Sequence, residues 1–274
     1  MSYALLNGHL LPAAEVHMHL PNRGLQFNDG FFETMVFEHG QVRWSKQHLA
    51  RMQRAAAALH LQLPTTLGNA PSLGQALAAL ASPIGGAARI RLQFWRAGGG
   101  LYAPKTNQAE WLATAAPFVA SDTPIGSAGF AQGISTQYSA VSFCKGPYAL
   151  HYVLAAQERE ARGLGELLLL DSKGHVAEAV SAALLWIRNE ELFTPAPESG
   201  CVAGVRQAHL LQVAQAKGIR CHLGLYRPEE VLAADAVFTA NVAGIRNIQQ
   251  LASATYKQTE HPLLDALRHW EKQD

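Results

Sequence analysis

Residues 164–180 read LGELLLLDSKGHVAEAV. Leu167–Leu170 is one apolar run, Asp171–Gly174 supplies turn-forming residues, and His175–Glu178 has the composition of a returning strand. The segment therefore predicts a hairpin of two buried strands that ends at a carboxylate, Glu178. A carboxylate at the end of a buried hairpin is a candidate functional group, although a glutamate after a hairpin is more often exposed.

Two further chemical groups flank this hairpin. Lys145 follows the β-like run 133–143 and precedes a helical pattern, so its ammonium is expected at the junction of two elements. On the other side, Gly204-Val205 opens the amphipathic helix predicted over 206–216. A helix that begins after a glycine offers unpaired backbone N–H groups and the positive end of its dipole, which together favour an anion.

An amine, a carboxylate and an anion seat are the three groups that pyridoxal phosphate requires. A lysine holds its aldehyde as a Schiff base, an acidic partner keeps the pyridine nitrogen protonated, and donors bind the phosphate. Each group alone has an ordinary explanation: a solvated lysine, an exposed glutamate or a helix-capping glycine. Their occurrence together, in one order, favours a pyridoxal phosphate site formed by Lys145, Glu178 and the Gly204-Val205 helix start.

Several longer segments carry a resemblance to a known family. They are NRGLQFNDGFFETMVFEHGQ (22–41), HLARM (48–52), LLLLDSKGHVAEA (167–179), LFTPAPESGCVAGVRQ (192–207) and DAVFTANVAGIRNI (235–248). In these segments the chain resembles the class IV, fold-type IV pyridoxal-phosphate enzymes, which include branched-chain aminotransferases, D-amino acid aminotransferases and aminodeoxychorismate lyases. The resemblance covers nearly the whole chain.

The resemblance implies an α+β fold of two domains and a homodimer. We expect a small N-terminal α/β domain over residues 1–115 and a larger, β-barrel-like pyridoxal-phosphate domain with helices over 127–274. Pro117, Asp122, Pro124 and Gly126 make 116–126 the best candidate for the linker between them.

The resemblance also assigns roles to cofactor residues. It implies that Lys145 is the Schiff-base lysine and that Glu178 is the partner of the pyridine nitrogen. The residues that it places at the phosphate are Arg51, Gly204, Val205, Arg206 and Asn241. A guanidinium suits bidentate contact with phosphate oxygens, although Arg51 alone would be interpreted as a solvated helix residue, and Asn241 alone as a turn residue.

The residues that bind substrate are less defined. Phe31 and Thr34 are candidates to face the pocket, with the alternative that Phe31 is a core residue. The arginine and histidine that D-amino acid aminotransferases use in a later loop are absent, so Arg96, Tyr102 or Lys105 could substitute. The alternative is that this loop is a mobile surface segment.

Three functions remain open at this point. We expect an aminodeoxychorismate lyase, which releases pyruvate and 4-aminobenzoate, because Asn241 and the spacing around it resemble the lyases. A branched-chain or D-amino acid transaminase is the alternative. A pyridoxal-phosphate-binding protein without turnover is the third, because Tyr148 and Ala183 stand where the family usually has asparagines.

Composition narrows the class of protein. With 274 residues, 49% hydrophobic and 16% charged, the chain can bury a sizeable core. A formal net charge of +1 gives no reason to expect nucleic acid or an anionic membrane as a partner. The three cysteines have no metal-type spacing, and no apolar stretch is long enough to span a membrane. We therefore expect a cytoplasmic protein without a metal, and the resemblance implies an enzyme that acts on a small, amino-acid-like substrate.

Local patterns predict the remaining elements. A hairpin is expected at Asn7-Gly8, and a helix is expected to begin with Ser45 as its N-cap. The other segments expected to be regular are the strands 31–37, 89–96, 111–114 and 237–239 and the helices 73–80 and 261–270.

Overall fold

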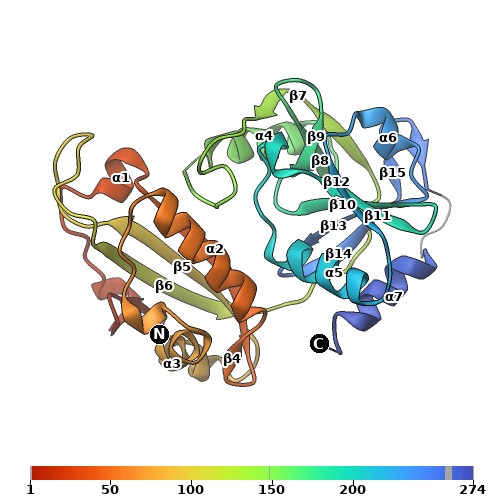
Figure 1. Cartoon of the computed structure of the whole chain (residues 1–274). Coiled ribbons are helices and arrows are strands. Elements are labelled where there is room, and N and C mark those ends of the chain that lie inside the picture. Colours follow the sequence, from red (N-terminus) through yellow and green to blue (C-terminus); the bar gives the residue numbers. More distant parts are fainter. Residues whose placement is uncertain (1, 148, 257–260, 274) are drawn as a thin grey trace. The chain divides into compact units, whose positions relative to one another are not determined.

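A computed structural model describes residues 2–147, 149–256 and 261–273 of the chain (Figure 1). Its contacts divide into two compact units. Unit 1 comprises Met1–Val119 and Cys144–Pro147, and unit 2 comprises Ala120–Phe143 and Tyr148–Asp274. Each unit combines sheets with helices, as expected for the α+β class. The segment around Lys145 thus belongs by its contacts to unit 1, whereas the sequence placed it in the second domain.

Unit 1 is built on a six-stranded antiparallel sheet with the order β2-β1-β6-β5-β3-β4 (Figure 1). Its strands are β1 (Tyr3–Leu6), β2 (His9–Pro12), β3 (Gly30–Glu38), β4 (Gln41–Val42), β5 (Ala88–Arg96) and β6 (Ala109–Pro117). Its helices are α1 (Arg23–Phe27), α2 (Ser45–Ala58) and α3 (Ala70–Ala81), with 3₁₀ turns η1 (Ala13–Glu15), η2 (Thr65–Leu67) and η3 (Ser82–Ile84).

The alternation of β3 assigns its side chains to two faces of the sheet. Glu33 contacts α2, so Phe31 and Met35, two positions away on either side, share that helix-covered face. Phe32 and Thr34 point to the opposite face and are only half-buried. Phe31 and Thr34, both expected to face the pocket, therefore lie on opposite sides of one sheet.

The connection between the units is largely hydrogen-bonded. The Phe118 N–H donates to Ala87 O in unit 1, and the Ser121 N–H donates to Ala243 O in unit 2. The Ser121 carbonyl lies so close to Gly244 that a Cβ there would be 1.8 Å from it, so only glycine fits. The contacts place the boundary between the two units at Val119 and Ala120, which lies inside the linker expected over 116–126.

Unit 2 contains two five-stranded sheets, ordered β12-β11-β10-β13-β14 and β16-β15-β7-β8-β9. The strands are β7 (Ala128–Thr136), β8 (Glu166–Asp171), β9 (Val176–Ala179), β10 (Ala183–Arg188), β11 (Glu191–Pro195), β12 (Cys221–Gly224), β13 (Ala236–Asn241), β14 (Gly244–Ile248), β15 (Gln250–Leu251) and β16 (Ala254–Thr255). The helices are α4 (Leu150–Ala161), α5 (Val205–Ala216), α6 (Pro228–Leu232) and α7 (Pro262–Trp270), with the 3₁₀ turn η4 (Pro197–Ser199).

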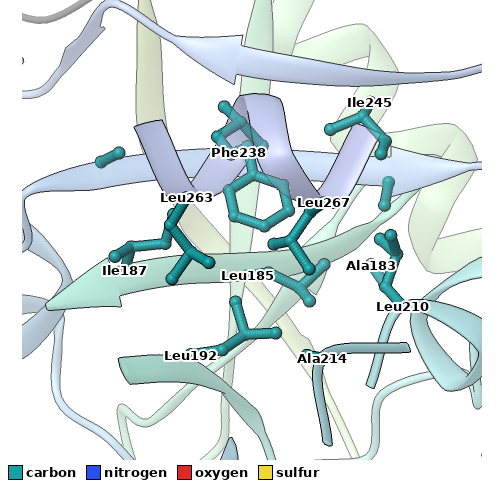
Figure 2. Packing of buried hydrophobic residues seen from close by; sticks show 13 residues of the cluster. Ala183, Leu185, Ile187, Leu192, Leu210, Ala214, Phe238, Ile245, Leu263 and Leu267 are labelled. Atoms are coloured by element: carbon teal, nitrogen blue, oxygen red, sulfur yellow. The ribbon is translucent and has the colours of Figure 1, made fainter. Parts of the chain in front are cut away.

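Apolar residues on both faces of these sheets form separate cores. One core joins the two sheets and includes Leu168 of β8 and Trp186 of β10. Another core packs α5 and α7 on the outer face of β10 and β13, where Leu185 and Phe238 meet Leu267 of α7 (Figure 2). Sheet alternation explains the arrangement, because Leu185 and Trp186 are consecutive and point to opposite faces.

Most elements expected from local patterns are confirmed. The Asn7-Gly8 hairpin joins β1 and β2, with both turn residues at positive φ. The expected β8–β9 hairpin is also present; it pairs Leu169 with Glu178, and its register shifts between Leu169 and Leu170. The remaining strands and helices overlap their expected ranges: β3, β5, β6, β13, α3, α5 and α7. These elements depend on turn residues and periodicity within a few residues of sequence, which explains why the sequence predicts them.

Two expectations were wrong. Ser45 is the first residue of α2 and Trp44, at φ 52°, is its N-cap. The strand expected over 133–143 is β7, which ends at Thr136, and residues beyond it form turns. Beyond the strand, the Ser139 hydroxyl accepts from the Val141 N–H, a local hydrogen bond of the kind that competes with strand pairing.

Within the described ranges, no helix combines the length and the apolar composition needed to cross a membrane.

Candidate functional site

The segment that carries Lys145 lies against the N-terminal half of β3 in unit 1. The Phe32 N–H donates to the Lys145 carbonyl at 2.9 Å, and the Asn28 side chain donates to Gly146 O at 2.6 Å. Gly146 has φ 130°, and a Cβ there would be 3.0 Å from the Phe31 Cα. Since β4 pairs only with the far end of β3, this half of the strand has an open edge, and the lysine segment occupies it.

Arg51 of α2 makes a bidentate ion pair with Glu33 of β3. The Arg51 Nε donates to Glu33 Oε1 at 2.7 Å and Nη2 donates to Oε2 at 2.6 Å. The His48 Nδ1 lies 2.7 Å from the same Oε2. All three residues are buried, and the guanidinium of Arg51 is therefore fixed in orientation by the β3 carboxylate.

The charge states of this cluster follow from its surroundings. Burial alone would raise the pKa of Glu33, but Arg51 and His48 outweigh it and lower that pKa to about 2. Burial lowers the pKa of His48 despite the neighbouring carboxylate. Glu33 is therefore an anion and His48 is neutral at pH 7, so His48 donates through Nδ1, while its Nε2 is buried without a hydrogen-bond partner in the described part of the chain.

Glu33→Gln is expected to destabilise the protein strongly. The variant leaves the Arg51 guanidinium buried without its anion, which costs about 3 kcal/mol or more. For a chain of this size, about 3 kcal/mol corresponds to a fall of roughly 6–12 °C in melting temperature. Circular dichroism melts of the two proteins at pH 7 measure the difference.

Glu38→Gln is the matched control, because Glu38 is also on β3 and also bidentate to an arginine, Arg43, but half-exposed. Its loss should cost under about 1 kcal/mol. The pH dependence has a defined sign: the Glu33 contribution is complete above the unfolded pKa of 4.5 and is lost as the pH falls from about 4.5 to about 2. Equal melting temperatures for both variants would contradict the buried pair.

In unit 2, Glu178 is a buried acceptor on β9. The Tyr152 hydroxyl of α4 donates to Glu178 Oε1 at 2.6 Å, and the Val202 N–H lies 3.2 Å from both carboxylate oxygens. The turn before β9 is fixed by Asp171, whose Oδ1 accepts from the His175 N–H at 2.8 Å. The hairpin thus places Glu178 as the sequence predicts, and Tyr152 is a contact that no sequence signal indicated.

The start of α5 lies two residues beyond Val202, so it is near Glu178 within unit 2. Gly204 is the N-cap, and its N–H donates to Gln207 Oε1 at 3.3 Å. A Cβ on Gly204 would be 3.1 Å from the Ala183 Cβ, so this close packing favours glycine. Val205 and Arg206 carry the first N–H groups of the helix, and such groups have no acceptor within a helix.

The side chains of Arg206 and Asn241 have structural partners. Arg206 is buried and pairs with Glu271 through Nε at 3.0 Å and Nη2 at 2.5 Å, while its Nη1 donates to Asn241 O. Asn241 Oδ1 accepts from the Ala243 N–H at 2.8 Å and from the Gly244 N–H at 3.2 Å. The turn explanation for Asn241 thus has direct support, and any phosphate contact of Arg206 is expected from its backbone.

Arg96 is committed to bonds within unit 1. Its Nε and Nη2 donate to Asp29 at 2.9 and 3.2 Å, and its Nη1 donates to Asn107 Oδ1 at 2.8 Å. The remaining N–H groups donate to the carbonyls of Leu59 and His60. All five donors are therefore used, which favours a structural role for Arg96 over the substrate contact that we expected.

Arg23 joins this cluster and fixes the glycine-rich loop. It donates to Asp29 at 2.7 Å and to the carbonyl of Leu101 at 2.5 Å. Burial would raise the pKa of Asp29, but the two arginines lower it. The Tyr102 side chain is 89% exposed and Lys105 is also exposed, so neither contacts a pocket within its own unit. The loop is anchored through its backbone, in contrast to the mobile surface segment considered above.

Two arginines that the sequence analysis did not select lie on the Thr34 face of the sheet. Arg91 of β5 is the cross-strand partner of Thr34, and its guanidinium carbon is 3.7 Å from the centre of the Phe32 ring. Arg89, two residues earlier, points to the same face. Neither has a carboxylate partner among the residues that the structure describes, and burial lowers the pKa of Arg91.

Phe31 stacks on Phe94 with ring centres 4.9 Å apart and is 2% exposed. These contacts support the alternative explanation given above, that Phe31 is a core residue. Ala183 is likewise part of a core, beside α5. Tyr148, the other departure from the family pattern, lies outside the described residues. The described residues contain no cluster of histidine, cysteine, aspartate and glutamate side chains that could bind a metal ion.

Comparison with known proteins gives two kinds of curated relative. The chain is 24% identical to the aminodeoxychorismate lyase of Vibrio harveyi over 246 residues, which cover 83% of this chain and 84% of that protein. It is also 24% identical to a probable branched-chain-amino-acid aminotransferase of Rickettsia bellii over 279 residues, covering 97% of this chain and 93% of that protein.

Solved structures share the fold. The branched-chain aminotransferase of Thermoproteus uzoniensis, solved with norvaline, has a TM-score of 0.87 at 21% identity and covers 99% of this chain and 94% of its own. That of Thermobaculum terrenum, in its PLP form, has a TM-score of 0.84 at 17% identity, with coverages of 99% and 93%. The profile of the class IV amino-transferases matches residues 30–251. The chain therefore belongs to the amino-transferase class IV family, whose members are pyridoxal-phosphate-dependent transaminases and lyases.

Proposed function

We propose that this enzyme is an aminodeoxychorismate lyase, which releases pyruvate and 4-aminobenzoate. The observation that carries the proposal is the pair Arg89 and Arg91, two arginines on one sheet face without a carboxylate partner in the described residues. The substrate of such a lyase has two carboxylates, and guanidinium groups suit carboxylates in bidentate geometry. A branched-chain amino acid has one carboxylate and an apolar side chain, which a pair of cations would match less well.

The residues present fit pyridoxal phosphate. We propose that the Lys145 amine binds the cofactor covalently, that Glu178 accepts a hydrogen bond from its pyridine nitrogen, and that the α5 start binds its phosphate. Glu178 suits this role because it is a buried carboxylate on a hairpin strand and accepts hydrogen bonds from Tyr152 and Val202. We retain Arg51 as a phosphate ligand, since its guanidinium is a cation that Glu33 holds in one orientation.

When bound, pyridoxal phosphate supplies an electron-withdrawing ring that stabilises negative charge on the substrate carbon next to the amine. The chain supplies the proton transfers. We propose that the Lys145 Nζ, displaced by the substrate amine, takes the proton from that carbon. Arg91 then orients the substrate through a carboxylate, next to Phe32, whose backbone N–H bonds the Lys145 carbonyl.

A branched-chain transaminase is the second candidate. It is favoured by the Rickettsia bellii relative, which matches a larger share of this chain than the Vibrio harveyi lyase does. The Phe32 ring also offers an apolar contact for a side chain. A homodimer and a cytoplasmic location stay predictions of the resemblance and the composition.

Product analysis distinguishes the two. The purified enzyme, loaded with pyridoxal phosphate, is incubated in parallel with aminodeoxychorismate and with L- and D-amino acids plus a keto-acid acceptor. We expect release of 4-aminobenzoate and pyruvate at a higher kcat/KM than any keto-acid transfer. Robust transfer from a branched-chain amino acid, together with no aromatic product, would replace the lyase by the transaminase.

Arg91→Ala is expected to raise KM for aminodeoxychorismate about 10- to 100-fold, because a charged hydrogen bond contributes roughly 1.5–3 kcal/mol. Arg89→Ala should raise KM in the same direction. Arg188→Ala is the control, since Arg188 is an exposed arginine at the end of β10 in unit 2. Steady-state kinetics give KM for each variant, and an unchanged KM in Arg91→Ala would remove Arg91 from the substrate site.

A further inference from the structure

A short hydrogen bond in unit 2 joins a residue without an assigned role to the carboxylate of Glu178. The Tyr152 hydroxyl lies 2.6 Å from Glu178 Oε1, which is typical of an O–H donor to a charged carboxylate. Such bonds contribute about twice as much as bonds between neutral groups. The contact from the Val202 N–H is longer and is shared between the two oxygens at 3.2 Å each.

We propose that Tyr152 is a positioning residue that holds the Glu178 carboxylate, in its charged form, in the orientation that meets the pyridine nitrogen of the cofactor. This inference rests on the proposed role of Glu178 and deepens it. Tyr152 acts through Glu178 and is not itself placed in contact with substrate or cofactor.

The geometry of the carboxylate supports this role. A carboxylate has about four lone-pair positions, so it can accept several donors at once, and the Tyr152 hydroxyl on Oε1 is the shorter of the two contacts described above. Without the hydroxyl, Oε1 would lose a 2.6 Å donor and the carboxylate would be held less firmly, because its last side-chain torsion is a soft one. The tyrosine therefore defines which oxygen is presented.

The fold explains how Tyr152 reaches Glu178. Leu169 of β8 is the cross-strand partner of Glu178, and the same Leu169 packs with Ala155 of α4 in a buried cluster. Tyr152 lies one helical turn before Ala155, so it is on the same face of α4 and packs against this cluster. The helix is thus held over the β8–β9 hairpin, and its first turns carry the hydroxyl to the carboxylate.

Tyr152 is also connected in sequence to the lysine segment. It lies seven residues after Lys145, in the first turn of the helix that follows. The same connection therefore supplies the proposed covalent ligand and the residue that orients the proposed ring-nitrogen partner. Local sequence alone gives no sign of this, because the contact with Glu178 spans 26 residues.

Tyr152→Phe tests the proposal, with Tyr256→Phe as the matched control. Tyr256 is a buried tyrosine of unit 2 whose hydroxyl donates to the Val231 carbonyl at 2.9 Å, so both variants remove one hydroxyl hydrogen bond. Two quantities are measured on full-length protein. One is the dissociation constant of pyridoxal phosphate, and the other is the ¹⁵N chemical shift of the ring nitrogen in ¹⁵N-labelled cofactor, with Glu178→Gln as reference.

We expect Tyr152→Phe to weaken cofactor binding about tenfold and to move the ¹⁵N signal from the protonated toward the unprotonated position, in the direction of Glu178→Gln. Tyr256→Phe should leave both quantities at their wild-type values. A thermal melt of each variant shows whether it is folded. We expect both variants to have a lower melting temperature, so that change alone does not distinguish them.

The possible outcomes separate the inference from the proposed function. If Glu178→Gln moves the ¹⁵N signal but Tyr152→Phe does not, Tyr152 has only a packing role and the inference is overturned while the proposed function stands. Weaker binding in Tyr152→Phe without a change of the signal overturns the inference in the same way. If the wild type fails to bind the cofactor, or Glu178→Gln leaves the signal unchanged, the proposed function and the inference both fail.

Discussion

Lys145→Ala is expected to abolish turnover, with a loss of about 1,000-fold or more. The variant removes the amine that we propose both binds the cofactor and moves the proton, and positioned acid–base groups alone contribute about 10²–10⁴-fold. Since the Lys145 segment is held by backbone bonds from Phe32 and Asn28, truncation of the side chain should leave the fold intact. Rates of 4-aminobenzoate release measure the effect.

Lys173→Ala is the control for this variant. Lys173 is an exposed lysine in the β8–β9 turn, so its replacement changes the net charge equally but should leave turnover unchanged. Residual activity in Lys145→Ala above about a tenth of the wild type would exclude Lys145 as the group that carries the reaction.

Glu178→Ala is expected to slow turnover by about 10²–10⁴-fold while the cofactor remains covalently attached. In the proposed role, the carboxylate keeps the ring nitrogen protonated, so its loss should make the cofactor withdraw electrons less strongly from the reacting carbon. The variant should also lose roughly 1–3 kcal/mol of stability, because the Tyr152 hydroxyl and the Val202 N–H lose their shared acceptor.

The loss of stability must be separated from the loss of chemistry. Thr194→Val is a suitable control, because Thr194 is a buried residue of β11 in the same unit, and its hydroxyl donates to the Leu184 carbonyl and accepts from Gln207. It should lower the melting temperature with little effect on kcat. A Glu178→Ala enzyme with unchanged kcat would show that the carboxylate is only a structural acceptor.

Residues whose structure is set by neighbours in sequence were predictable. The β8–β9 hairpin depends on Asp171 and Gly174, and the α5 start depends on Gly204, all within a few residues of the elements they define. The order of these elements and the segments around them also carry the family resemblance, which is why the cofactor could be inferred from the sequence alone.

Residues whose role depends on cross-strand or interhelical partners were not predictable. Arg96 resembled a substrate ligand until Asp29, 67 residues away, was found to take two of its donors. In the sequence, Arg91 is one of several charged residues on an alternating strand, and nothing there marks it as a substrate ligand. The structure makes it a candidate because it has no carboxylate partner among the described residues. Tyr152 was missed because its partner, the Glu178 carboxylate, is 26 residues away in the sequence.

The substrate is harder to infer than the cofactor for a physical reason. Pyridoxal phosphate needs a lysine, a partner for its ring nitrogen and donors for its phosphate, so a lysine, a glutamate and a helix start in one order favour that cofactor. A substrate carboxylate can be bound by any suitably placed cation, so no fixed sequence pattern marks the residue that binds it.

Borohydride reduction tests the central claim most directly, namely that Lys145 is the residue to which pyridoxal phosphate is attached. The purified protein is incubated with the cofactor, reduced, digested and analysed by mass spectrometry, with unreduced protein as the reference. We predict one stoichiometric pyridoxyl adduct on the peptide that contains Lys145, and its disappearance in Lys145→Ala. A stoichiometric adduct on another lysine, or none at all after incubation with the cofactor, would contradict this claim.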